Sequence, residues 1–246
     1  MNKRFDPLGC GSIQISRLKD SVTLKMPDTK FSLTDTVPLP NSQVRIPRLG
    51  FGVYQSSTWQ CVTSCLTALK EGYRHIDTAQ FYGNEEEVGE AVRQSGLSRA
   101  DVFITTKILS AGGSVDKSYA KCLASVRKID PREEGYVDLF LIHSPNAGSK
   151  ARKEMWLALE RLYEEGRAKS IGVSNFGTGH IEEMKGYAKV WPPHVNQIEV
   201  RLVDRISRWT LIQTPAASLV PTKSHRRLLP AKGDRGRSLL APGAQL

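Results

Sequence analysis

Four residues of this sequence have side chains suited to reducing a carbonyl group: Asp77, Tyr82, Lys107 and His143. A tyrosine hydroxyl has an ordinary pKa of about 10, so it is a poor proton donor near neutral pH. A neighbouring lysine ammonium favours the phenolate and lowers that pKa, and a carboxylate can hold the lysine in place. A histidine can orient the carbonyl oxygen. We therefore predict Tyr82 as the general acid, tuned by Lys107 and Asp77, with the hydride coming from a bound cofactor.

Each of these residues, taken alone, also fits a structural role. A lone lysine or aspartate near a strand end is usually solvated, a lone tyrosine belongs to the core or rim, and a lone histidine is usually structural. The prediction of a shared site depends on position, because Asp77, Lys107 and His143 each lie near the end of a predicted strand. Tyr82 follows Asp77 by five residues and falls in the loop after that strand.

Strands and helices alternate from residue 46 onward. Apolar, β-branched runs predict strands, and apolar residues at spacings of three and four predict amphipathic helices. The predicted strands are 46–54, 75–79, 102–108, 136–143, 169–174 and 194–200, and the predicted helices are 58–71, 85–94, 117–128, 153–165 and 180–189. Successive βα units of this kind predict a parallel sheet covered by helices.

The alternation predicts the α/β fold class, as a TIM (β/α)8-type barrel that is incomplete, with about six βα units. A doubly wound dinucleotide-binding sheet is disfavoured, because Gly50 and Gly52 are followed by Gln55 and no GxGxxG turn is present. Barrel active sites form at the C-terminal ends of the strands, so the four polar residues would meet at one mouth. A hairpin predicted at residues 37–46 would plug the opposite end.

Three segments are predicted along the chain: a loose N-terminal extension at 1–30, the barrel portion at 31–200, and an atypical basic Pro/Arg-rich tail at 201–246. The tail holds nine Lys and Arg and two acidic residues, so it carries most of the formal net charge of +10. It resembles the product of a reading-frame shift, a retained intron or an alternative exon.

A barrel without its last two units predicts unpaired edges on strands one and six, reduced stability and weak dinucleotide binding.

Five motifs make this sequence similar to the aldo-keto reductase superfamily. They are GYRHIDTAQFYGNE at 72–85, FITTK at 103–107, DLFLIH at 138–143, IGVSNF at 171–176 and VNQIE at 195–199. The motifs occur in the family's order, and the resemblance covers roughly residues 35–200. It implies an NAD(P)H-dependent reductase of aldehydes or ketones on a TIM barrel. The sequence also resembles filamentous-fungal members, which implies a role in tailoring a secondary metabolite.

The resemblance assigns site residues to matching positions. The implied catalytic residues are Asp77, Tyr82, Lys107 and His143, and His143 also binds the substrate. The implied cofactor-binding residues are Gly52, Val53, Tyr54, Asp77, Ser174, Asn175 and Gln197. Among these, Ser174, Asn175 and Gln197 would hold the nicotinamide carboxamide. The implied cofactor is NADP (NADPH), with NAD less favoured, and the implied partner is a small-molecule carbonyl substrate.

Two parts of the family pattern lack a counterpart in the sequence. One is the aromatic residue of strand seven that stacks on the nicotinamide, and the other is a Lys-Ser and Arg cluster that holds the adenosine phosphate. The dipeptide Lys223-Ser224 has no strand pattern before it and is not assigned to that cluster. The alternative interpretation is therefore a truncated, catalytically silent relative that acts as a binding or regulatory protein.

Composition sets the remaining expectations. No apolar run approaches ~18 residues, so no membrane span is expected, and the N-terminus lacks the apolar segment of a secretory signal. The four cysteines show no CxxC pair, which predicts free thiols in a reducing cytosol and no metal site. The basic tail is expected to be solvated rather than to bind nucleic acid. We expect a cytoplasmic protein, and the sequence does not predict its oligomeric state.

Overall fold

The computed structural model describes residues 32–200 and 210–214 of the chain. The chain divides into two units, Met1–Phe31 and Ser32–Leu246, and every described residue belongs to the second unit. The predicted N-terminal extension at 1–30, and the basic tail at 201–246 apart from 210–214, lie outside the described residues.

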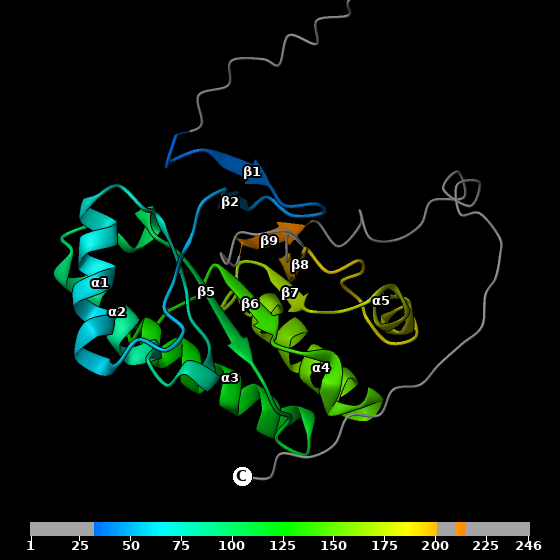
Figure 1. The fold of residues 1–246 in the computed structure, drawn as a ribbon. Coiled ribbons are helices and arrows are strands. Elements are labelled where there is room, and N and C mark those ends of the chain that lie inside the picture. Colours follow the sequence, from blue (N-terminus) through cyan, green and yellow to red (C-terminus); the bar gives the residue numbers. More distant parts are fainter. Residues whose placement is uncertain (1–31, 201–209, 215–246) are drawn as a thin grey trace, which may run out of the picture. The chain divides into compact units, whose positions relative to one another are not determined.

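A seven-stranded sheet in the order β3-β4-β5-β6-β7-β8-β9 forms the centre of this unit (Figure 1). The strands are β3 (Phe51–Gly52), β4 (His75–Asp77), β5 (Phe103–Ile108), β6 (Leu139–Ile142), β7 (Ile171–Ser174), β8 (Val195–Val200) and β9 (Thr210–Thr214). Every neighbouring pair from β3 to β8 is parallel. The sheet is a curled half-barrel, so the predicted fold class and its six parallel strands are confirmed.

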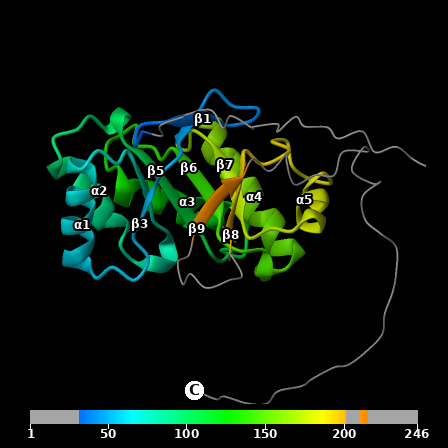
Figure 2. The same cartoon turned by 45° about the horizontal axis from the view of Figure 1, so that its top comes forward.

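The helices of the described chain follow the strands in alternation. They are α1 (Thr58–Lys70), α2 (Glu85–Gln94), α3 (Val115–Ile129), α4 (Ser149–Glu164) and α5 (Thr178–Met184), with short 3-10 helices at Gln80–Tyr82, Arg99–Asp101 and Pro145–Ala147. Figure 2 shows α1 and α2 toward the β3 end of the sheet and α4 and α5 toward the β8 end. None of the described helices is long and apolar enough to cross a membrane.

The last helix is shorter than the sequence predicts. The apolar spacing predicts a helix over 180–189, whereas α5 ends at Met184. The backbone N–H groups of Lys189 and Val190 instead donate to the carboxylate of Glu160 on α4, at 2.6 and 2.8 Å. This buried acceptor competes with the helical hydrogen bonds, and it holds the segment before β8 in a non-helical path.

The side chains of β5 alternate between the face that packs against the helices and the face that lines the inside of the half-barrel. Ile104 and Ile108 belong to the apolar core that packs against the helices, whereas Phe103 packs on the other face with the hairpin. Successive side chains of a strand point to opposite faces, so Lys107 lies on the same inner face as Phe103. Lys107 therefore reaches the C-terminal mouth of the half-barrel from inside.

The predicted hairpin is present as β1 (Thr36–Pro38) and β2 (Arg45–Pro47), which pair antiparallel with Val37 opposite Ile46. Ile46 packs against residues at or near the starts of the parallel strands, including Phe103 and Val195. The hairpin therefore covers the N-terminal end of the half-barrel, opposite the ends that carry the predicted site.

Strand β9 corrects one expectation. We predicted that the sixth parallel strand, β8, has an unpaired edge, but β9 pairs with it antiparallel over five residue pairs, from Asn196 opposite Thr214 to Val200 opposite Thr210. The β-branched residues of Thr210–Thr214 favour an extended strand. This strand was not predicted, because it does not belong to a βα repeat. The outer edge of β3 has no partner strand among the described residues.

Candidate active site

Lys107 is the centre of the predicted site, and its side chain is 1% exposed. Its ammonium donates a short hydrogen bond to a carboxylate oxygen of Asp77, at the end of the neighbouring strand. It also donates to the backbone carbonyl of Thr78 at 2.9 Å and to the Tyr82 hydroxyl at 3.4 Å. Three acceptors thus surround a buried cation, which is the arrangement that makes burial of the charge tolerable.

Gln197 from β8 binds the other side of the same carboxylate. Its side-chain N–H donates to Asp77 Oδ2 at 2.8 Å, across the curled sheet from β4. Asp77 is therefore held from two sides, by Lys107 and by Gln197. The contact joins residues 120 positions apart in sequence, and only the curl of the sheet brings them together.

Tyr82 reaches the site from the 3-10 helix Gln80–Tyr82, which follows β4. Gly83 ends this turn with a φ of +70°, a left-handed conformation that glycine adopts without strain. The Tyr82 ring lies 5.0 Å from the Lys107 ammonium and 5.6 Å from the His143 ring, measured between centroids for the two rings. The predicted convergence of all four residues at one mouth is what the structure shows.

Burial raises the pKa of Tyr82 above its ordinary value, and the Asp77 carboxylate adds to the shift. The sequence predicts a lowered pKa for Tyr82, whereas the structure gives a raised one. The loss of water around the phenol is the largest cause of the shift. A raised pKa keeps Tyr82 protonated at neutral pH, and it also makes the phenol a weaker acid than an ordinary tyrosine.

Burial also lowers the pKa of His143 to about 4, and the positive charge of Lys107 acts in the same direction. The imidazole is therefore neutral at pH 7, with one N–H donor and one acceptor. His143 Nδ1 is buried and has no hydrogen-bond partner in the described part of the chain. A neutral imidazole whose ring lies beside that of Tyr82 suits a group that donates a hydrogen bond to a substrate oxygen.

The three residues predicted to hold a nicotinamide carboxamide lie together. Ser174 Oγ donates to the backbone carbonyl of Gln197 at 3.0 Å, and Asn175 Nδ2 donates to Ser174 Oγ at 3.3 Å. Asn175 is exposed and has a φ of +61°. The side-chain nitrogen of Gln197 donates to Asp77, and the side-chain oxygen of Gln197 remains as an acceptor next to Ser174 and Asn175. These donors and acceptors fit a planar amide.

The β3–α1 segment forms the rim next to Tyr82. Val53 is buried, and its N–H donates to the backbone carbonyl of Asp77 at 3.1 Å. Tyr54 is 56% exposed, and its ring lies 4.9 Å from that of Tyr82. Gly52 is exposed, with no atom within 4 Å of where a Cβ would stand. All three predicted residues are at or beside the mouth.

Sequence reasoning missed two residues of the site. Asn84 is buried and ties the rim to β4: its N–H group donates to Val53 O at 2.9 Å, and its oxygen accepts from Thr78 Oγ1 at 2.7 Å. Phe81 is 60% exposed, with its ring 6.2 Å from the His143 ring. A polar residue inside the motif, two positions after Tyr82, was the available signal for Asn84.

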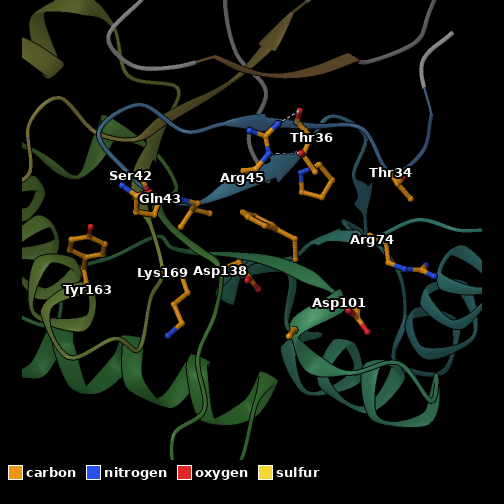
Figure 3. A pocket seen from close by; sticks show the side chains of 14 residues that line it. Thr34, Thr36, Ser42, Gln43, Arg45, Arg74, Asp101, Asp138, Tyr163 and Lys169 are labelled. Atoms are coloured by element: carbon orange, nitrogen blue, oxygen red, sulfur yellow. Dashed lines mark hydrogen bonds between the residues drawn. The ribbon is translucent and has the colours of Figure 1, made fainter.

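A separate cavity of about 590 Å3 lies at the opposite end of the half-barrel, and neither Tyr82 nor Lys107 lines it. Its walls come from the hairpin and from the starts of strands, including Arg45, Phe103 and Lys169. Figure 3 shows Arg45 at this cavity, hydrogen-bonded to Thr36. The cavity is therefore distinct from the predicted active site.

A curled parallel sheet with its polar residues gathered at the C-terminal ends of the strands defines a protein of the β/α-barrel class. Within that class, the profile of the Aldo/keto reductase family matches residues 54–218, and the chain belongs to this family.

Individual relatives and solved structures agree with this family assignment. The chain is 42% identical over 170 residues to a glyoxal reductase of Bacillus subtilis, covering 68% of this chain and 59% of the relative. The structure of an aldo/keto reductase from Brucella melitensis is similar, with 44% identity and a TM-score of 0.63 over 68% of this chain and 63% of the other. The structure of an aldo-keto reductase of Bombyx mori in complex with NADP is also similar, with 29% identity and a TM-score of 0.60 over 68% of this chain and 58% of the other. The chain thus spans about three fifths of these relatives.

Proposed function

We propose that this protein reduces an aldehyde or ketone to an alcohol with NADPH. The observation that carries the proposal is the contact of the Lys107 ammonium with both Asp77 and the Tyr82 hydroxyl, beside a neutral His143. This arrangement offers a proton donor and a carbonyl-orienting group at one mouth. The chemistry that bound NADPH supplies is transfer of a hydride to the carbonyl carbon.

The chain's own residues act on the carbonyl oxygen. His143 donates a hydrogen bond that orients the oxygen toward Tyr82, and the Tyr82 hydroxyl gives its proton to that oxygen as negative charge develops there. Lys107, beside the phenol, stabilises the phenolate that is left, and Asp77 keeps the ammonium in place. Tyr82 then regains a proton from water.

The cofactor proposal rests on the amide-binding group at β7 and β8. Ser174, Asn175 and Gln197 would hold the nicotinamide carboxamide, with Gly52, Val53, Tyr54 and Asp77 close to the ring. The exposed Asn175 leaves this side of the mouth open to a ligand. NADP is favoured over NAD because a solved relative is described with NADP.

The substrate class is a small carbonyl compound, as the name of the glyoxal reductase relative suggests. Tailoring of a secondary metabolite is the narrower proposal. We also propose a cytoplasmic location, which the free thiols of Cys61, Cys65 and Cys122 support because reducing compartments keep thiols unpaired.

The test measures NADPH oxidation with a panel of aldehydes and ketones. Tyr82→Phe removes the proton donor and is expected to lower kcat at least about 100-fold, the usual contribution of a general acid. Tyr119→Phe is the matched control, because Tyr119 lies on α3 and donates its hydroxyl hydrogen to Glu165, the residue after α4. Full turnover by Tyr82→Phe contradicts the proposal.

A catalytically silent binding protein is the second candidate. The observation in its favour is that β9 pairs antiparallel with β8, so the parallel sheet of the described chain stops at six strands. Folded protein that binds NADPH without turnover on any carbonyl of the panel supports this candidate over the first.

A further inference from the structure

Glu85, the first residue of α2, is a buried carboxylate that no step of the proposed reaction uses. It is 3% exposed. One oxygen accepts from the Thr106 hydroxyl of β5 at 2.5 Å, and the other accepts from the Ser125 hydroxyl of α3 at 3.0 Å. The Ser125 hydroxyl in turn accepts from the Gln80 side-chain N–H at 2.9 Å. A continuous hydrogen-bonded chain therefore joins Gln80 to Thr106 through Glu85.

The two ends of this chain lie next to the two groups proposed to move the proton. Gln80 begins the 3-10 helix that ends at Tyr82. Thr106 precedes Lys107 in β5, and neighbouring residues of a strand point to opposite faces. Glu85 thus holds β5 from the helix side while Lys107 faces the mouth.

Both oxygens of the Glu85 carboxyl group act as hydrogen-bond acceptors in this chain. Ser125 has one hydroxyl hydrogen, which goes to Glu85, and its lone pair receives the Gln80 N–H. Thr106 likewise gives its hydrogen to Glu85. A glutamine at position 85 replaces one acceptor oxygen by an N–H donor, so one of the two hydroxyls loses the acceptor of its hydrogen and that link of the chain is reversed or lost.

The 3-10 helix that carries Tyr82 has few other anchors. Its backbone contributes the bonds from Tyr82 N–H to Ala79 O at 3.0 Å and from Gly83 N–H to Gln80 O at 3.2 Å. Phe81, in the middle of the turn, is 60% exposed. The Gln80 side-chain amide, which donates to Ser125 Oγ at 2.9 Å and to the Lys121 backbone carbonyl at 3.3 Å, therefore holds this turn against α3.

We propose that Glu85 is a positioning residue, which sets the 3.4 Å separation between the Tyr82 hydroxyl and the Lys107 ammonium through Ser125 and Gln80 on one side and Thr106 on the other. The effect of Glu85 on the reaction rate rests on the proposed function. Misplacement of a reacting group by about 1 Å costs up to about 100-fold in rate, whereas binding of a cofactor on the far side of the mouth is affected little.

The kinetic test compares Glu85→Gln with Glu160→Gln. Glu160 is a matched control, because it is also 3% exposed and accepts from Trp156 Nε1 and two backbone N–H groups, away from the mouth. Glu85→Gln is expected to lower kcat at least about tenfold with the KM for NADPH within about twofold. Glu160→Gln is expected to keep kcat within about twofold even if its Tm falls. Equal kcat in the two variants overturns the inference.

A second pair of variants separates positioning from general damage. Thr106→Val removes the hydroxyl at constant size and is expected to reproduce the kcat loss of Glu85→Gln. Thr106→Ser keeps the hydroxyl and is expected to restore most of the activity. A loss of the same size in both variants at position 106 contradicts a role of the hydrogen-bonded chain.

A measurement without turnover keeps this inference distinct from the proposed function. Amide hydrogen exchange at Tyr82 and Gly83 is expected to accelerate in Glu85→Gln and to stay unchanged in Glu160→Gln, because only the first variant loosens the turn. If the unaltered protein shows no turnover, the proposed function fails and exchange alone decides. Unchanged exchange at Tyr82 and Gly83 in Glu85→Gln then overturns the positioning role.

Discussion

Separating the charges of the Asp77–Lys107 pair is the most direct perturbation of the site. Asp77→Asn leaves the Lys107 ammonium, 1% exposed, without a negatively charged partner and with only neutral acceptors, among them the Thr78 carbonyl and the Tyr82 hydroxyl. Lys107→Met leaves the Asp77 carboxylate with the Gln197 N–H as its remaining side-chain donor. Removing one partner of a buried ion pair typically costs about 3–5 kcal/mol, because the other charge stays buried without compensation.

The double variant Asp77→Asn/Lys107→Met is expected to be more stable than the sum of the single losses implies. Neither charge remains, so the uncompensated burial that dominates each single variant is absent. Residues in direct contact couple by about 0.5–3 kcal/mol in such cycles, and the upper part of that range applies to a pair as buried as this one.

Urea unfolding at pH 7 measures these differences. With an m-value of roughly 2 kcal/mol per M, a loss of about 3–5 kcal/mol lowers the midpoint by roughly 1.5–2.5 M for each single variant. The double variant is expected to recover part of that loss. Strict additivity of the two single losses, or midpoints that stay at the value of the unaltered protein, would refute the assignment of a buried, mutually compensating pair.

The remaining predictions concern pH and backbone packing. Burial lowers the pKa of His75 and of His143 to about 4, below the ordinary 6.5, so the unfolded chain binds more protons between those values. Stability is therefore expected to fall as the pH drops from about 6.5 to about 4, and His143→Asn should make the Tm less sensitive to pH there; an unchanged slope argues against a neutral, buried imidazole. Gly172→Ala places a Cβ 2.5 Å from the Val195 carbonyl oxygen and is expected to cost about 1–3 kcal/mol in thermal or urea unfolding. Gly52→Ala, with no atom within 4 Å of its Cβ, is the control and should unfold close to the unaltered protein.

The elements that position the site were predictable because their signals are local. Strand β5 is recognisable from its β-branched run, and the helix start at Glu85 from the acidic residues in its first turn. The positions of Asp77 and Lys107 at strand ends then place them at one mouth, since parallel strands of a barrel end on the same side. The short strand β9 was missed, because an antiparallel partner does not follow from the βα repeat.

Chain order and residue type determined the architecture of this protein: a repeated βα pattern, a hairpin before it, and an aspartate, a tyrosine, a lysine and a histidine at successive strand ends or the loops after them. Only the tertiary structure decided how these groups behave. The pKa of Tyr82 rises because water is excluded around the phenol and because the Asp77 carboxylate lies nearby. The chain through Glu85 forms because α2, α3 and β5 pack together. Desolvation and hydrogen-bond partners depend on distances between segments far apart in sequence, and no local pattern of residues encodes those distances.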